Sequence, residues 1–369
     1  MQDSHTQILN SLSNRDNLTK LDTLGMMDLV LGFPKQCRDG AAISWQYGHG
    51  STAQTDIRNV VYTGLGGSAI GGDLLRCLAD EYGSIPIIVN RDYTLPAWVG
   101  PSTLLLAASY SGNTEETLAA TTAGLKAEAQ IAMVTSGGTL AKIGAAEGCP
   151  VAIVPGGQPP RTATGYLFFP ALTYLQHRHF LRKDFQEDSE ETFLVLEKMA
   201  KEYGPDVPVE QNPAKQLAIQ LFGKIPVLYG SQGYRGVAAY RWKCQFNENT
   251  KIAAFSNVLP EQNHNEILAW VLGEKQASNW SAIFLRDPKE EELQPRIATR
   301  VAVTKELVSR TTPVHEIFAQ GESLLARLLS IIYMADFVTV YLAYLYGICP
   351  TDIGYIDHLK EALAKEVSK

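Results

Sequence analysis

The sequence has no run of basic residues. Its 369 residues include 32 lysines and arginines against 39 aspartates and glutamates, which gives a formal net charge of −7 at pH 7. Proteins that bind nucleic acid usually carry a basic patch or stripe. We therefore exclude nucleic acid as a main partner. Any phosphorylated ligand must be held by local groups, because the overall charge does not attract it.

Cysteine is scarce and scattered. The five cysteines are odd in number and form no Cys-x-x-Cys pair. This pattern is typical of free thiols in a reducing compartment and argues against a disulfide framework or a zinc site. His177 and His179 have no third ligand near them in the sequence, so we expect no metal there.

The apolar core of a signal peptide is also missing, because the first 18 residues are polar. The longest apolar run, 324–346, contains Arg327 and Asp336. Charged residues inside the run favour a buried helix over a membrane span. We expect a cytoplasmic protein with no membrane partner.

What the sequence does contain is a regular alternation. Short apolar runs alternate with segments typical of helices, and turns rich in small residues follow many of the runs. This pattern predicts an α/β fold with parallel sheets flanked by helices. The expected strands are 59–63, 85–90, 103–108, 129–135 and 150–154, then 224–230, 252–255, 281–285 and 314–318. Because the second half repeats the pattern of the first, we predict two tandem α-β-α sandwich domains.

Length and composition suggest the limits of these domains. A chain of this length is long enough for two domains. Residues 1–54 are mostly polar and read as an N-terminal helical arm, and 55–183 form the first domain. The charged and then Gly- and Pro-marked segment 184–212 reads as a connecting helix and linker, and 213–369 as the second domain with C-terminal helices.

One turn stands out between the strand at 103–108 and the helix after it. The stretch 109–117 reads SYSGNTEET and carries two serines, two threonines and an asparagine. Hydroxyl groups beside the free N–H groups of a helix N-terminus can hold a phosphate. The same residues also suit an ordinary helix cap, with Thr114 as the N-cap. On this stretch alone, both readings stand.

A glycine-rich turn follows the strand at 59–63. The stretch 64–72 reads GLGGSAIGG and partly matches a dinucleotide fingerprint. At the end of the next strand, where a ribose-binding acid is expected, the chain offers Asn90-Arg91-Asp92, so the match is partial. Ser68 instead suits a compact sugar phosphate, held in the crevice that two neighbouring strand ends form.

Further motifs follow in order along the chain. They are Pro160-Arg161, Gly165-Tyr166, Arg241-Trp242-Lys243, Glu248-Asn249, the stretch PEQNHNE at 260–266, Pro350, and LKEAL at 359–363. With the two turns, this set resembles the sugar isomerase (SIS) fold and, within it, the bifunctional phosphoglucose/phosphomannose isomerases of archaea and bacteria. The resemblance covers residues 55–365 and implies two SIS domains. It also implies an intramolecular oxidoreductase of carbohydrate metabolism that interconverts glucose 6-phosphate, and mannose 6-phosphate, with fructose 6-phosphate.

The resemblance assigns roles to individual residues. Glu248 would move a proton between C2 and C1, and Arg161 would stabilise the enediolate. His264, from the neighbouring subunit of a homodimer, would open the sugar ring with Lys360. The implied catalytic residues are Glu248, His264, Lys360 and Arg161, and the implied substrate-binding residues are Gly67, Ser68, Ser109, Ser111 and Thr114. Such chemistry requires acid, base and hydrogen-bond donors but no metal or redox cofactor.

Plainer interpretations stay open beside this one. A glutamate in a polar turn, an arginine in a loop and a lysine on a helix face are commonly solvent-exposed. Glu261 and Glu266 are alternative acids, and Glu266 could orient the imidazole of His264. A non-catalytic protein that binds sugar phosphates would keep the hydroxyls but would not need Glu248. An NAD(P)-dependent enzyme would use the glycine-rich turn.

Overall fold

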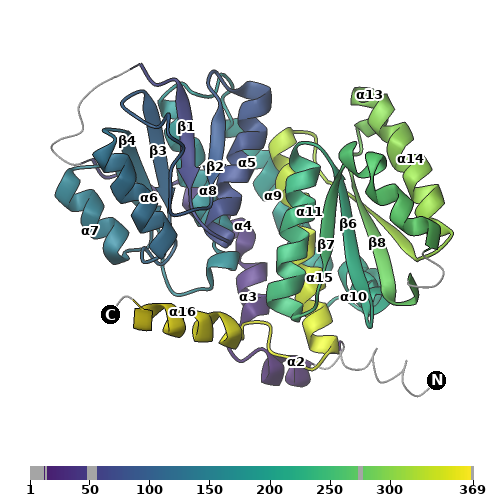
Figure 1. Cartoon of the computed structure of the whole chain (residues 1–369). Coiled ribbons are helices and arrows are strands. Elements are labelled where there is room, and N and C mark those ends of the chain that lie inside the picture. The colour runs from purple at the N-terminus through teal and green to yellow at the C-terminus, as the bar shows by residue number, and fades with distance from the viewer. Residues whose placement is uncertain (1–11, 13–14, 48–55, 273–276, 367–369) are drawn as a thin grey trace.

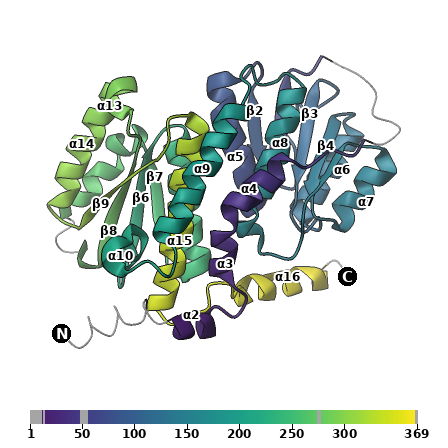
Figure 2. The ribbon, with the colours of Figure 1, turned by 180° about the vertical axis from the view of Figure 1, so that it is seen from behind.

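The structure is a computed structural model that describes residues 12, 15–47, 56–272 and 277–366 of the chain. Two halves lie side by side, each built on its own sheet, with helices packed between them (Figure 1). The view from behind shows the same arrangement, with α9 (Gln186–Tyr203) and α15 (Leu324–Leu345) between the sheets (Figure 2).

The first half contains a five-stranded parallel sheet of order β2-β1-β3-β4-β5. Its strands are β1 (Asn59–Thr63), β2 (Ile87–Asn90), β3 (Thr103–Ala108), β4 (Gln130–Thr135) and β5 (Val151–Ile153). Its helices are α5 (Gly67–Tyr82), α6 (Glu115–Lys126), α7 (Gly138–Glu147) and α8 (Thr164–His177). β3 is buried along its whole length, as its continuous apolar run requires of a strand covered on both faces. The five strands expected here are confirmed.

The second half repeats this design with four parallel strands in the order β7-β6-β8-β9. Its strands are β6 (Ile225–Ser231), β7 (Phe255–Leu259), β8 (Trp280–Arg286) and β9 (Val314–Phe318). Its helices are α10 (Pro213–Leu221), α11 (Tyr234–Gln245), α13 (Glu290–Leu293) and α14 (Pro295–Ser309). The strands β1 and β6 hold the same place in their sheets, and each leads into a helix whose N-cap glycine, Gly66 or Gly233, has a positive φ.

The prediction of a strand at 252–255 is wrong, because β7 begins where that range ends. Residues 246–250 form a π-helical turn, η3 (Phe246–Thr250), and the segment after it leads the chain away from that turn. The Asn247 side chain donates a hydrogen bond to the Ile252 carbonyl (2.8 Å). This carbonyl is thus bound to a side chain and not to a neighbouring strand. Pairing with β6 starts at Phe255 and runs to Leu259.

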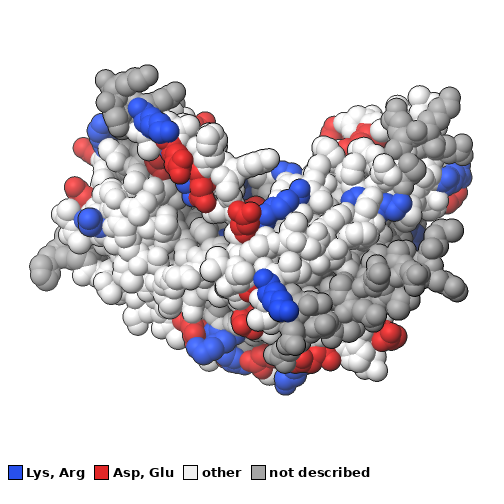
Figure 3. All heavy atoms as spheres, turned by 90° about the horizontal axis from the view of Figure 1, so that it is seen from below, with Lys and Arg blue, Asp and Glu red and all other residues white. Residues whose placement is uncertain are grey.

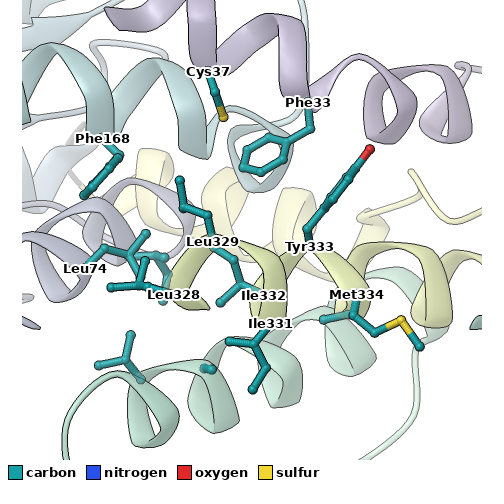
Figure 4. Packing of buried hydrophobic residues seen from close by; sticks show 14 of the residues in the cluster. Phe33, Cys37, Leu74, Phe168, Leu328, Leu329, Ile331, Ile332, Tyr333 and Met334 are labelled. Carbon is teal, nitrogen blue, oxygen red and sulfur yellow. The ribbon is translucent and has the colours of Figure 1, made fainter. Parts of the chain in front are cut away.

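Helix α15 is the centre of the core. It packs against α9, α10 and α11 and also touches α3 (Met26–Leu31). The helix is long and apolar enough to cross a membrane, but 94% of its apolar window is buried inside the fold. Figure 4 shows Leu329 and Tyr333 of α15 beside Phe33 and Cys37, and the rings of Phe33 and Tyr333 lie 5.1 Å apart. The expected buried helix is therefore confirmed.

The N-terminal helices pack on their own chain. They are α2 (Arg15–Leu21), α3 and α4 (Phe33–Ala41), and α4 lies against α8 and α9. Met26 and Phe33 are buried, and the Tyr333 hydroxyl donates to the Val30 carbonyl (2.8 Å). Residues 1–11, 13–14 and 48–55 of the expected arm lie outside the described part of the chain. The domain limits remain a prediction.

Helix α15 carries a buried carboxylate, Asp336. Asp336 on α15 accepts a hydrogen bond from the Gln245 side chain, and its carboxylate lies 3.5 Å from the Arg241 guanidinium. Burial raises the pKa of Asp336 from its ordinary value of 3.8 to about 6, and the neighbouring Arg241 and Gln245 offset only part of that rise. The folded state therefore keeps this proton at pH values where the unfolded chain has released it.

Asp336 should give the free energy of unfolding a distinct pH dependence. Its stabilising contribution is complete below about pH 4, where both states are protonated, and is lost as the pH rises through about 6. The free energy of unfolding should therefore fall over this range by up to about 3 kcal/mol from this group. Urea unfolding of the wild type and of Asp336→Asn between pH 4 and 8 measures the difference.

The exposed Asp92 supplies the matched control. Asp92→Asn should leave the shape of the stability curve unchanged, whereas Asp336→Asn should flatten it. Parallel curves for the wild type and Asp336→Asn would mean that Asp336 does not hold a proton in the folded state.

Candidate active site

The first part of the candidate site is the turn between β1 and α5. At Gly67 a Cβ atom would lie 2.7 Å from the Pro160 carbonyl oxygen, so glycine allows the short helix η1 (Pro160–Thr162) to approach α5. The Ser68 hydroxyl accepts a hydrogen bond from the Tyr110 backbone N–H (3.2 Å). This bond joins the turn after β1 to the turn after β3.

The turn after β3 is organised around the Ser109 hydroxyl. This oxygen lies 2.8 Å from the Thr114 hydroxyl and accepts hydrogen bonds from the backbone N–H groups of Gly112 (3.1 Å) and Thr114 (3.4 Å). Thr114 is the N-cap of α6, as one reading of the sequence expected, but its side chain makes no capping bond. The first backbone bond of the helix runs from Leu118 N–H to the Thr114 carbonyl (3.0 Å), which leaves the first-turn N–H groups available to an anion.

Arg161 lies at the junction of the two halves. Its side chain is only 2% exposed, so the reading of Arg161 as a solvent-exposed loop residue is wrong. The guanidinium Nε donates to the Asn249 side-chain oxygen (2.8 Å) and Nη2 donates to the Pro350 carbonyl (2.8 Å). Burial lowers the pKa of Arg161, and the nearby Glu248 carboxylate opposes that change.

Glu248 faces this cation. It lies in the π-helical turn η3, which continues α11, and its Oε2 is 3.5 Å from Nη1 of Arg161. The Glu248 side chain is partly exposed, whereas its neighbours Asn249 and Thr250 are buried against α15. A carboxylate that reaches solvent can take a proton from a ligand and return it. The buried cation beside it can stabilise the negative charge that develops on the ligand.

Two residues near this pair carried no role in the sequence reasoning. Lys251 donates from Nζ to the carbonyls of Glu248 (2.6 Å) and Pro350 (3.0 Å), and burial lowers its pKa. Asn249 links Arg161 to Thr339 of α15, because its side-chain nitrogen donates to the Thr339 hydroxyl (3.0 Å). The Glu248-Asn249 motif marked the place of Asn249, but no sequence signal showed that its side chain binds Arg161.

His264 and Lys360 are not brought to this pair within one chain. His264 is exposed on the 3₁₀ helix η4 (Glu261–His264). Lys360 is 68% exposed on α16 (Gly354–Glu366), 4.0 Å from Asp357. In Figure 1, α16 lies beneath the first half. Among the described residues, neither side chain makes a hydrogen bond or ion pair with Arg161 or Glu248.

The alternative acids have other partners. Glu266 lies in η5 (Glu266–Leu272) and accepts hydrogen bonds from the Tyr229 hydroxyl and the Asn257 side chain, both at 2.6 Å. Its two oxygens are thus bound to the sheet, so the reading in which Glu266 orients the imidazole of His264 finds no contact here. Glu261 is exposed and accepts from the Asn265 side chain (3.2 Å).

The turn in the second half that corresponds to the turn after β3 is occupied by charged side chains of the protein. The turn after β8 holds the topological position of the turn after β3, but it carries Asp287 and Glu290. Glu290 is paired with Arg235 (2.6 Å) and Arg286 (2.7 Å), and all three side chains are buried. The carboxylate therefore takes the charge-assisted bonds that an external anion would need.

The two halves thus differ in what their strand ends offer. The space-filling view from below shows a hollow between the two lobes, with acidic and basic side chains gathered beside it (Figure 3). On the first half, the exposed Ser111 and the partly exposed Thr114 lie at the N-terminus of α6, whereas Ser68 and Ser109 are buried and hold the two turns together. On the second half, the partly exposed Glu248 meets Arg161.

Comparison with known proteins gives the context for this geometry. Residues 210–363 match a family model described as the bacterial phospho-glucose isomerase C-terminal SIS domain. The bifunctional phosphoglucose/phosphomannose isomerase of Caldicellulosiruptor bescii is 41% identical over 341 residues, which cover 92% of this chain and 99% of that protein. The corresponding protein of Thermoplasma acidophilum is 37% identical over 316 residues, which cover 85% and 93%.

A solved structure agrees on the fold. The C-terminal domain of glucosamine-fructose-6-phosphate aminotransferase from Francisella tularensis superposes with a TM-score of 0.67 and 14% identity, covering 89% of this chain and 98% of that one. The two-domain α/β prediction and the resemblance drawn from the sequence are confirmed. By its fold and by its similarity over nearly its whole length, the chain belongs to the bifunctional phosphoglucose/phosphomannose isomerase family.

Proposed function

We propose that the chain is an aldose–ketose isomerase that interconverts glucose 6-phosphate, and mannose 6-phosphate, with fructose 6-phosphate. The observation that carries this proposal is the Glu248 carboxylate 3.5 Å from the buried Arg161 guanidinium, at the junction of the two halves. The similar proteins are named for activity on phosphoglucose and phosphomannose, which supports the same substrates. Sugar phosphates and five unpaired cysteines suit a cytoplasmic enzyme.

The proposed mechanism assigns the two ends of the substrate to the two halves. Ser68, Ser109, Ser111 and Thr114 bind the phosphate with the first-turn N–H groups of α6, which positions C1 and C2. Starting from the open-chain aldose, Glu248 takes the proton from C2 and returns it to C1, while the O2 hydroxyl proton passes to O1. Arg161 stabilises the enediolate between these steps. Because electrons move only within the sugar, this is an intramolecular oxidoreduction that requires no external oxidant.

Ring opening is assigned to His264 and Lys360 across a homodimer. Both side chains are exposed in one chain, and exposed apolar residues lie close to each of them in the sequence. Leu268, Val271 and Leu272 of η5 are exposed near His264, and Tyr355 and Leu359 of α16 are exposed near Lys360. Apolar surfaces of this kind favour burial against another protein surface. A second copy would supply it and would bring His264 to the neighbouring site.

Glu248→Gln should abolish turnover without abolishing binding. The amide keeps the shape of the side chain but cannot accept the C2 proton, so kcat should fall by about 1,000-fold or more while KM changes little. A coupled assay of fructose 6-phosphate formation from each aldose, run in EDTA, measures this effect.

The exposed Glu261 provides the matched control, and Glu261→Gln should retain full activity. Full activity in Glu248→Gln would remove Glu248 as the base. A thermal shift with fructose 6-phosphate but no turnover by the wild type would indicate a non-catalytic sugar-phosphate binder. A shift with NAD and none with fructose 6-phosphate would indicate a dinucleotide enzyme.

Mixed dimers test the assignment of His264. His264→Ala and Glu248→Gln should each be inactive alone. If His264 acts in the neighbouring subunit, co-assembled chains should recover about a quarter of wild-type activity, because half of the dimers are mixed and each mixed dimer has one intact site. No recovery in mixed dimers confirmed by native mass spectrometry would show that each site is complete within one chain.

A further inference from the structure

The Arg161 guanidinium is held in one plane by two bonds. Nε is bound to the Asn249 side-chain oxygen and Nη2 to the Pro350 carbonyl, both at 2.8 Å. A guanidinium presents its donors as a rigid planar fork, so bonds on two of its nitrogens fix the direction of the third. That third nitrogen, Nη1, is the one that lies 3.5 Å from Glu248.

Asn249 is itself held by the buried helix α15. Its side-chain nitrogen donates to the Thr339 hydroxyl (3.0 Å), and Thr339 donates in turn to the Ala335 carbonyl (2.8 Å). The next residue, Thr250, donates to the Thr339 carbonyl (2.9 Å). Asn249, Thr250 and Thr339 are each at most 1% exposed. The orientation of the Asn249 amide is therefore set by α15.

This arrangement keeps the cation and the carboxylate close without a hydrogen bond between them. The structure has an ion pair at 3.5 Å between the described residues Arg161 and Glu248, but no hydrogen bond. An arginine free to turn tends to bind a carboxylate through two parallel N–H···O bonds. A carboxylate in such a pair accepts a proton less readily, which weakens it as a base.

We propose that Asn249 is a positioning residue: by binding Nε of Arg161 while anchored to Thr339, it prevents a two-bond pair between Arg161 and Glu248 and keeps both groups directed at the substrate. This inference rests on the proposed isomerase function. It concerns the orientation of Arg161 and not the identity of the base.

Other charged and titratable groups surround Glu248. The Asn249 side chain binds only Arg161 among them, and the Asn249 backbone carbonyl accepts a hydrogen bond from Nζ of Lys251 (3.4 Å). Lys251 at the end of η3 binds the Glu248 carbonyl, and Cys244 lies on α11 within electrostatic range. From α15, Asp336 pairs with Arg241, which donates to the Arg161 carbonyl. Replacing Asn249 leaves these contacts in place, so its effect should come through the Arg161 side chain.

Asn249→Ala is the direct test. Releasing Nε should lower kcat by about 10- to 100-fold with little change in KM, because the phosphate-binding turns are untouched. The acidic limb of the kcat/KM profile should move to lower pH by about half a unit or more, because a carboxylate bonded to a guanidinium binds a proton only in more acidic solution. A purely structural role would lower the amount of folded enzyme without moving this limb.

Thr339 supplies a second pair of variants outside the site. Thr339→Val removes the hydroxyl beneath Asn249 and should move kcat and the acidic limb in the same direction as Asn249→Ala, by a smaller amount. Thr339→Ser keeps the hydroxyl and should restore both. Thermal unfolding and active-site titration correct every value for folded protein.

The outcomes separate the two proposals. An inactive wild type contradicts the isomerase function itself. An active wild type with an unmoved acidic limb in Asn249→Ala overturns the positioning role while the isomerase stands. If Asn249→Ala does not fold, equal profiles for Thr339→Val and Thr339→Ser overturn it instead.

Discussion

The Arg161 guanidinium joins parts of the chain that are far apart in sequence. It follows the last strand of the first half, binds the side chain of Asn249 in the second half, and binds the carbonyl of Pro350 before the C-terminal helix. A buried cation without bonding partners would be costly, and each of these bonds offsets part of that cost. The bonds that join these distant segments thus also place a positive charge beside Glu248.

The two halves arrange their strands in the same way, but their strand ends carry different side chains. In the first half, the turns after β1 and β3 carry small residues and hydroxyls, and the N-terminus of α6 is uncapped by side chains. In the second half, the matching turn is filled by Glu290 between Arg235 and Arg286. One copy of the repeated design can therefore receive an anion, while the other is closed by a carboxylate of its own and contributes Glu248 instead.

Much of the fold could be predicted because each strand is marked by a short apolar run in its own stretch of sequence. β3 begins and ends at the expected residues, since its apolar run is bounded by Ser102 and Ser109. β7 was misplaced because Ile252 to Phe255 is also apolar, yet only pairing with β6 decides which residues join the sheet. The turn η3 packs on α15 through Asn249 and Thr339, 90 residues apart, and Arg161 is bound by Asn249 and Pro350. None of these contacts had a local signal.

By itself, the sequence determined the two parallel sheets, the hydroxyl-rich turn at 109–117 and the set of motifs that identifies the family, because each is written in consecutive residues. Only the tertiary structure decided how these parts meet. It placed Arg161 3.5 Å from Glu248, oriented it through Asn249, and left His264 and Lys360 at the surface. These outcomes depend on packing between distant segments, and a side chain's neighbours across a domain junction are not encoded in its own stretch of chain.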